Sequence, residues 1–338
     1  MINYNILEIK RAIFHKVMAR RADCESYVVE SDTLRELTVD MKDILRKRMS
    51  DAFGNAGRAF ELSINDVEDG SVYSIIHNLR HENDSVFYQK SVDLANKLAF
   101  CQNKTSIPHG FFVLLDCVNP LDNMPVYVIM KAEPHDAVEI TQSLARAINN
   151  IILSTSQKMY KAGCFQQFNT EGGHRGYKAY LFDEQFGSRA HLAEYFYRDF
   201  MGLTVSANDK VLTKMFFAKM TDAIKDKYKN DYLRKNDADE VLNAEMHNQN
   251  TTLNPRDVID RAICLDDRDY FYRRVLSEEM PPSFRKNISL IDSRMINRSM
   301  SISDDIKIFA PQGMFQDDSF VIDRETDNDY VIVKIRKN

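Results

Sequence analysis

The chain has few of the features that mark secreted, membrane-spanning or metal-binding proteins. Its five cysteines are scattered without CxxC spacing, and an odd number argues against a disulfide framework or a zinc ribbon. The first residues, MINYNILEIKRAIFHKV, lack the apolar core and cleavage site of a signal peptide, and no run of about 18 apolar residues occurs. The sequence therefore predicts a protein of the reducing cytoplasm without a membrane span.

Motifs for hydrolysis and nucleotide binding are missing as well. There is no GxSxG nucleophile elbow, and the GNAG run at residues 54–57 lacks the GK[ST] ending of a phosphate-binding loop. His77 and His81 have helical spacing but not the glutamate of an HExxH zinc motif, so we interpret them as a surface pair. The sequence predicts no enzyme activity and no cofactor.

The alternative that the sequence offers to a protein without enzyme activity is a metal-dependent nuclease. Glu8 and Lys10, and likewise Asp40 and Lys42, have the acid-x-Lys spacing with which some nucleases hold a metal ion and orient water. Short patterns of this kind also occur by chance in most charged proteins. Mg²⁺-stimulated DNA cleavage that is lost on changing Glu8 or Lys10 would identify this activity.

A global excess of positive charge is absent too. The chain has 45 Lys and Arg against 50 Asp and Glu, for a net charge of −5, so any attraction to nucleic acid must come from a local patch. Segment 206–235 holds eight cations and four carboxylates. Its candidate phosphate contacts are Lys210, Lys214, Lys219, Lys225 and Lys227. The alternative is a solvated helix face with charge pairs between successive turns.

Two smaller basic groups precede this segment in the chain. They are Arg46, Lys47 and Arg48, and then Arg175, Lys178 and Arg189. Tyr177 and Tyr180 stand beside the second group as candidate stacking surfaces, although tyrosines in such a strand are more often core residues.

Hydrophobic periodicity divides the 338 residues into about two domains of roughly 150 residues each. The first, residues 1–185, is predicted to be an α/β region with a mostly antiparallel sheet. Its expected helices are 34–53, 70–80 and 84–102. Its expected strands are 6–18, 110–118, 126–133, 144–153, 159–168 and 177–182, with a hairpin connection at 170–173.

The second region, residues 186–338, is predicted to be a helical middle followed by a small C-terminal β-unit, which makes the fold class α+β. A helix is expected to begin at an N-cap Ser206 and to reach Tyr228. The polar stretch 225–252 is expected to be a mobile connection with room for a short helix. Further helices are expected from Asn254-Pro255 and over 267–276, and strands over 300–309, 319–323 and 329–336.

Three sequence blocks occur in the order in which one known family carries them. They are the strand pair GFFVLL and VYVIM (110–115 and 126–130), YKAYLF with Phe196 and FMG (177–182 and 200–202), and SISDDIKIFAP with its continuation (301–311 and 320–335). In these blocks the chain resembles the bacterial 37-kDa nucleoid-associated protein family (YejK/NdpA-like). Met201 stands where the family pattern has leucine.

The resemblance implies association with the nucleoid, binding of double-stranded DNA and a connection with topoisomerase function, without supplying catalytic residues. We therefore expect a non-enzymatic, bacterial chromosome-organising protein that contacts the DNA backbone through local basic patches and acts as a homodimer, since bridging DNA benefits from two linked sites. The alternative is a protein-interaction module that regulates a DNA enzyme or a defence component. The acidic net charge and the acidic stretch 317–329 favour this alternative.

Overall fold

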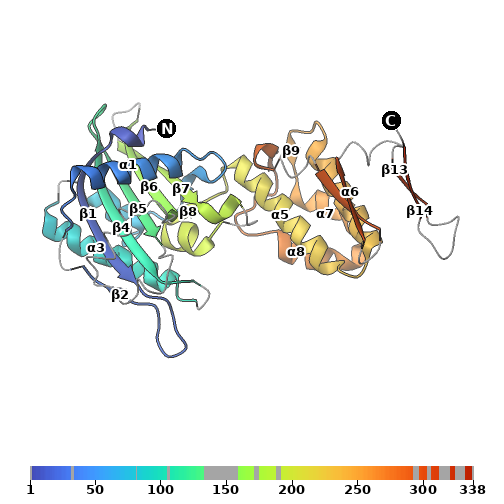
Figure 1. Ribbon diagram of the computed structural model, residues 1–338, viewed down its shortest axis with the longest axis horizontal. Coiled ribbons are helices and arrows are strands. Elements are labelled where there is room, and N and C mark those ends of the chain that lie inside the picture. The colour runs from blue at the N-terminus through green and yellow to red at the C-terminus, as the bar shows by residue number, and fades with distance from the viewer. Residues whose placement is uncertain are drawn as a thin grey trace. The chain divides into compact units, whose positions relative to one another are not determined.

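The protein consists of two compact units, Met1–Ala207 and Asn208–Asn338 (Figure 1). The computed structural model describes residues 2–31, 34–80, 82–104, 107–132, 159–170, 175–187, 192–291, 297–302, 306–311, 320–323 and 332–336. The fold class is α+β, as the sequence predicts. The expected boundary after residue 185 would separate strand β8 (Leu203–Thr204) from the first unit, where β8 pairs with strand β3.

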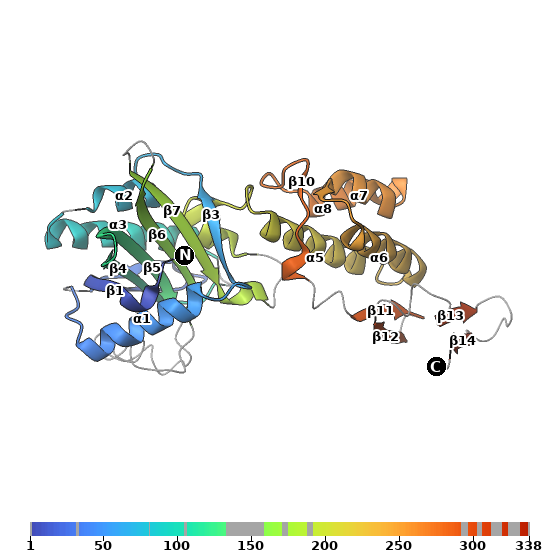
Figure 2. The same cartoon turned by 90° about the horizontal axis from the view of Figure 1, so that it is seen from above.

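An eight-stranded antiparallel sheet forms the centre of the first unit, with strand order β2-β1-β4-β5-β6-β7-β3-β8 (Figure 2). Its other strands are β1 (Glu8–Val17), β2 (Val28–Val29), β3 (Ala59–Ile64), β4 (Gly110–Asn119), β5 (Met124–Ala132), β6 (Met159–Asn169) and β7 (Arg175–Asp183). The predictions for β1 and β4 to β7 are confirmed, whereas β3 was not expected. The predicted strand 144–153 and residues 171–173 of the predicted hairpin connection lie outside the described residues.

Strands β4 and β5 are buried along almost their whole length. Helix α1 (Val39–Phe53) covers one face of the sheet, where Leu45 and Met49 join the same hydrophobic core as Leu115. Helix α3 (Asp84–Cys101) lies on the opposite face (Figure 2). Each fully buried leucine or isoleucine contributes about 1.5–3 kcal/mol, so this double cover supplies much of the stability of the unit.

Side-chain caps decide where the helices of the first unit begin. Thr38 Oγ1 accepts a hydrogen bond from the Met41 N–H at 3.3 Å, so α1 begins at residue 39 and not at the predicted 34. Ser71 caps helix α2 (Val72–Asn78) and Asn83 caps α3 in the same way. The short π-helix η4 (Tyr195–Phe200) ends the helical part of this unit.

The second unit contains four α-helices within its described residues. They are α5 (Asp209–Lys227), α6 (Tyr232–His247), α7 (Pro255–Ala262) and α8 (Arg268–Val275). The predictions for α7, with Asn254 as its N-cap, and for α8 are confirmed. Helix α5 is buried on more than the one side that its periodicity predicted, because Phe216 and Met220 are buried as well as Met215. No described helix is long and apolar enough to cross a bilayer.

The structure corrects the predicted start of α5 and the predicted mobile connection. Helix α5 begins after Asn208, whose Oδ1 accepts from the Val211 N–H at 3.1 Å, and not after Ser206. Most of the stretch predicted as a mobile connection is helix α6, which is capped by Asp231 and buries Met246. Capping and burial outweigh the polar composition of this stretch.

Short antiparallel strand pairs complete the second unit. They are β9 (Thr252–Leu253) with β10 (Phe284–Arg285), β11 (Asn297–Ser301) with β12 (Lys307–Pro311), and β13 (Phe320–Asp323) with β14 (Ile332–Ile335). The expected single strand at 300–309 is in fact two paired strands, β11 and β12. The other two C-terminal strands lie where the alternating pattern placed them.

Gly202 and Met201 have positions that explain the second of the three sequence blocks. Gly202 has φ of 67°, and a Cβ there would lie 2.6 Å from the Cβ of Asp66. Its carbonyl oxygen accepts from the N–H groups of Asn65 and Asp66, both at 2.9 Å. The side chain of Met201 fills the space where a Cβ on Gly163 would lie. Only glycine suits this conformation and this close approach.

We predict that Gly202→Ala lowers the free energy of unfolding of the first unit by about 2 kcal/mol, because alanine is strained at positive φ and clashes with Asp66. Urea unfolding measures the loss. Gly57→Ala is the matched control, because a Cβ there meets only the Asn55 side chain at 3.5 Å, an ordinary contact distance. Equal losses in the two variants would contradict this account.

His15 is a fully buried histidine on the α3 side of the sheet. The Ser31 N–H donates to its Nδ1 at 3.1 Å, so Nε2 carries the proton and donates to Ser91 Oγ at 2.8 Å. Ser91 in turn donates to the Tyr88 carbonyl at 2.6 Å. Burial lowers the pKa of His15 to about 4, while the charge of Glu30 acts in the opposite sense. The neutral ring therefore ties β1 to α3.

We predict that this histidine makes the first unit acid-sensitive. Its pKa is lowered from 6.5 on folding, so only the unfolded chain takes up a proton as the pH falls below 6.5. The wild type should lose about 2 kcal/mol of unfolding free energy between pH 7 and pH 5 that His15→Gln does not lose. Urea titrations at both pH values measure the difference, and His247→Gln, at an exposed position, should behave like the wild type.

Candidate nucleic-acid interface

Basic side chains of the second unit gather where the C-terminal end of α5 meets α8. Asp226 of α5 accepts a hydrogen bond from Tyr270 Oη at 2.9 Å and forms an ion pair with Arg274 at 3.5 Å. Lys227 Nζ lies 5.5 Å from the centre of the Tyr270 ring. The packing of α8 on the last turn of α5 thus brings together cations that are far apart in the sequence.

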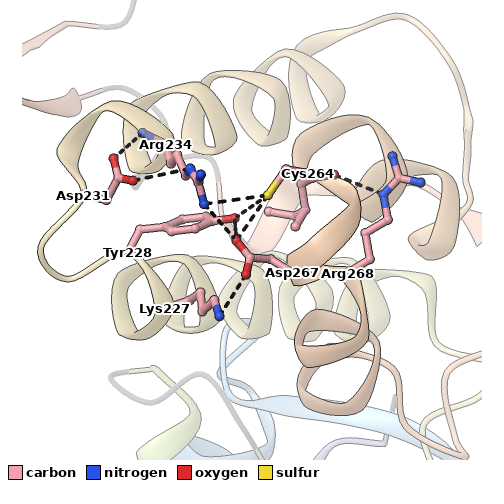
Figure 3. Close-up of polar contacts among 8 residues, drawn as sticks. Lys227, Tyr228, Asp231, Arg234, Cys264, Asp267 and Arg268 are labelled. Carbon is pink, nitrogen blue, oxygen red and sulfur yellow. Dashed lines mark hydrogen bonds and ion pairs between the residues drawn. The ribbon is translucent and has the colours of Figure 1, made fainter.

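Asp267 lies at the centre of the polar contacts in this region (Figure 3). Its carboxylate is almost buried, with the residue 8% exposed, and Oδ1 is 2.9 Å from Lys227 Nζ. Its Oδ2 accepts from Tyr228 Oη at 3.0 Å and from Cys264 Sγ at 3.2 Å, and lies 3.4 Å from an Arg234 guanidinium nitrogen. One carboxylate therefore fixes two cations from α5 and α6.

The protonation states of this cluster follow from these contacts. The hydrogen bond from Lys227 lowers the pKa of Asp267 to about 2, although burial acts in the opposite sense. Burial, followed by the hydrogen bond to Asp267, raises the pKa of Tyr228. Near neutral pH Asp267 is thus ionised and Tyr228 is a neutral donor, so Asp267 offsets the charge of the cations beside it.

We call the five cations of this region the α5-end patch. The α5-end patch consists of Lys225, Lys227, Lys229, Arg234 and Arg274, and the carboxylates paired with it are Asp226, Asp231 and Asp267. Five positive and three negative charges leave an excess of two. Lys225 and Lys229 are exposed and form no ion pair within the described part of the chain. They carry the charge that the patch has available for a ligand.

The remaining candidates on α5 lie elsewhere along the helix. Lys210 is exposed in the first turn, and Lys219 is partly buried. Lys214 is only 3% exposed, on a helix face that packs inside the unit. Its burial removes Lys214 from any surface that a ligand can reach. The sequence analysis included Lys214 because helical periodicity cannot separate an exposed lysine from one whose stem is covered.

On α1, the three predicted cations differ in their availability. The Arg46 guanidinium donates to the Leu7 carbonyl at 2.7 Å and pairs with Asp43 at 2.6 Å. Burial lowers the pKa of Arg48. Lys47 is exposed and forms no ion pair with a described residue. Of these three cations, Lys47 is the one that is exposed without an ion pair among the described residues.

Strand β7 carries the last predicted group. Arg175 is exposed at its first residue, whereas Lys178 lies 3.9 Å from Glu61 and 5.7 Å from the centre of the Phe168 ring. Tyr180 is buried in the core, which leaves Tyr177 as the partly exposed ring. The remaining candidate, Arg189, lies outside the described residues.

Two aromatic residues lie beside Tyr177: Tyr73, which the sequence analysis did not name, and His77, which it interpreted as a surface histidine. Tyr73 and His77 of α2 lie with their ring centres 5.9 Å and 5.8 Å from that of Tyr177. The four-residue spacing of Tyr73 and His77 is visible in the sequence and places both on one side of a helix. Their contact with β7 is not, since about 100 residues separate the two segments and only the sheet brings them together.

The two acid-x-Lys pairs do not assemble a metal site in the described part of the chain. Glu8 and Lys10 form an ion pair with each other, and the hydrogen bond from Lys10 lowers the pKa of Glu8. Asp40 and Lys42 lie in the first turn of α1. Among the described residues, no group of three or more His, Cys, Asp or Glu side chains is arranged to hold a metal ion.

We predict that Asp267→Asn lowers the unfolding free energy of the second unit by about 1–3 kcal/mol at pH 7, because Lys227 and Arg234 lose a charged acceptor. The pKa of Asp267 is lowered in the fold, so the carboxylate stabilises above its ordinary value of 3.8, and this contribution disappears as the pH falls towards 2. Urea unfolding read from amide exchange in α5 and α8 measures the loss. Tyr228→Phe, which removes one donor and no charge, should cost less; an equal cost would contradict this role for the charge.

Comparison with known proteins gives the family. A family model described as nucleoid-associated protein YejK matches residues 15–326 of the 338. Among curated proteins, none matches the chain significantly. The family match reaches from β1 to β13 and includes the strand pair β4 and β5 and the segment that ends at Gly202. Because it extends over far more than half of the sequence, the chain belongs to the nucleoid-associated YejK family.

Proposed function

We propose that this protein is a non-enzymatic, nucleoid-associated protein that binds double-stranded DNA through local basic patches, chiefly the α5-end patch. The family membership supports the nucleoid association. The observation that carries the DNA contact is the exposure of Lys225 and Lys229 beside cations already held in place by Asp226 and Asp267. The family is one of nucleoid-associated proteins rather than of enzymes.

The chemistry of the patch fits the phosphate backbone rather than base edges. Lysine ammonium groups neutralise phosphates and release condensed counterions, which gives affinity that depends on salt and tolerates any sequence. Lys227 and Arg234 are oriented by Asp267, so little side-chain entropy is lost when a phosphate approaches them. Such a patch suits a protein that binds chromosomal DNA at many positions.

The first unit adds further contacts in this proposal. Lys47 on α1 and Arg175 on β7 are exposed, and Lys178 is partly balanced by Glu61. Weak contacts gain avidity when they are linked, within one chain or in a homodimer, because the second contact forms at a high effective concentration. We accordingly propose a homodimer that acts in the cytoplasm at the nucleoid.

A second candidate function is a protein-interaction module that regulates a topoisomerase-like enzyme without holding DNA strongly. The observation that favours it is the pairing of the patch: three of its five cations face carboxylates, and the whole chain has a net charge of −5. A surface of alternating, fixed charges selects a complementary protein surface. The salt dependence of DNA affinity separates the two functions.

For DNA binding by the α5-end patch, we predict that the double variant Lys225→Glu and Lys229→Glu binds a labelled duplex several-fold more weakly at low salt. Fluorescence anisotropy across a salt series measures this affinity. The slope of log affinity against log salt should fall by about 1.8, since each lost phosphate contact removes about 0.9.

The matched control reverses the same charge elsewhere. Arg21 and Lys104 are exposed cations of the first unit that belong to no proposed patch, and Arg21→Glu with Lys104→Glu should leave the slope unchanged. If both double variants weaken binding equally, net charge rather than this patch governs the affinity. If the wild type shows no salt-sensitive binding, the interaction module is the better account.

A further inference from the structure

Three rings form a cluster on the first unit, far in sequence from the α5-end patch. Tyr73 and His77 of α2 lie nearly parallel, with ring centres 5.8 Å apart and an interplanar angle of 30°. Tyr177 of β7 meets both rings edge-on, at interplanar angles of 87° and 64°. His77 is exposed, and the two tyrosines are partly exposed. The cluster therefore presents aromatic surface to solvent from two different elements.

A buried amide fixes this cluster and a neighbouring arginine in one arrangement. Gln167 is 2% exposed and faces Tyr177 across the β6–β7 pair. Its Nε2 donates to Tyr177 Oη at 3.1 Å, and its Oε1 accepts from an Arg80 guanidinium nitrogen at 2.6 Å. The ring of Tyr177 and the positive charge of Arg80 are thus set by the same side chain.

The two charged side chains that act on Tyr177 are positive. Burial raises the pKa of Tyr177 to about 12, while the nearby charges of Arg80 and Arg175 act in the opposite sense. Arg175 is exposed two residues before Tyr177, so both side chains leave β7 on the same face of the sheet. Exposed rings flanked by two guanidinium groups combine a stacking surface with partners for phosphate.

We propose that Tyr73, His77 and Tyr177, with Arg80 and Arg175, form a binding site for unpaired nucleobases of single-stranded nucleic acid. The proposal takes from the proposed function only that the partner is a nucleic acid. The site itself is independent of that function, because the three rings take no part in the proposed duplex contacts and belong to the first unit, whereas the α5-end patch belongs to the second.

The occupant follows from the geometry of bases. In a duplex the faces of the bases are stacked on one another, so protein rings have no access to them, whereas an unpaired base offers a free face. Every base has such a face, so stacking tolerates any sequence and suits a protein without base-edge contacts. The two arginines supply the charge that a passing backbone requires. Only single strands thus engage the three rings, whereas duplex DNA binds chiefly through the α5-end patch.

The test uses the full chain and labelled oligothymidine of about 15 nucleotides, which forms no duplex, with a labelled duplex measured in parallel. His77→Ala should weaken binding of the single strand about ten-fold at every salt concentration and leave duplex binding unchanged. Arg175→Gln should instead lower the salt slope for the single strand by about 0.7. Oligouridine of the same length serves as a further probe. Whichever of oligothymidine and oligouridine binds more tightly identifies single-stranded DNA or RNA as the preferred ligand.

Two controls separate stacking from folding and from general stickiness. Tyr177→Phe keeps the ring but loses the hydrogen bond from Gln167, so it should bind the single strand more tightly than Tyr177→Ala does. Phe100→Ala removes an aromatic side chain that is 80% exposed elsewhere in the unit and should have no effect. The inference is overturned if His77→Ala leaves oligothymidine binding intact, or if Phe100→Ala weakens it as much. Absence of wild-type binding to either DNA would instead refute the proposed function itself.

Discussion

Strands β4 and β5 are apolar on both faces, and the sheet that they centre must be kept from water on both sides. This constraint places α1 on one face and α3 on the other, and it fixes the register of β1, which carries His15 into the space below α3. Slipping a strand by one residue would exchange its two faces, so the arrangement is strongly specified.

The cations of the protein fall into two classes, those with a fixed acceptor and those without one among the described residues. Paired cations such as Arg46 and Lys227 have fixed acceptors, and these contacts belong to the fold as much as to any ligand. Exposed lysines such as Lys47, Lys225 and Lys229 have none among the described residues. A counterion-release ligand such as DNA draws on the second class, so an overall acidic chain is compatible with binding a polyanion locally.

The two proposed surfaces use different physics on the same polymer. In the proposed function the α5-end patch offers point charges to phosphates, a kind of contact whose affinity falls with salt. The rings of Tyr73, His77 and Tyr177 offer faces to bases, and stacking is much less sensitive to salt. In the two proposals, duplex DNA and unpaired bases are therefore recognised by separate surfaces through different interactions.

The sequence by itself determined the α+β class, the central strand pair, the starts of α7 and α8 and the family, because these depend on local periodicity, caps and long ordered blocks. It misplaced the start of α5 and treated α6 as a connection, because Asn208 and Asp231 act through hydrogen bonds that composition does not reveal. Only the tertiary structure decided that Lys214 is buried while Lys225 is exposed, and that Tyr73 and His77 meet Tyr177. Burial and long-range contact depend on how distant segments pack, and no window along the chain contains both partners.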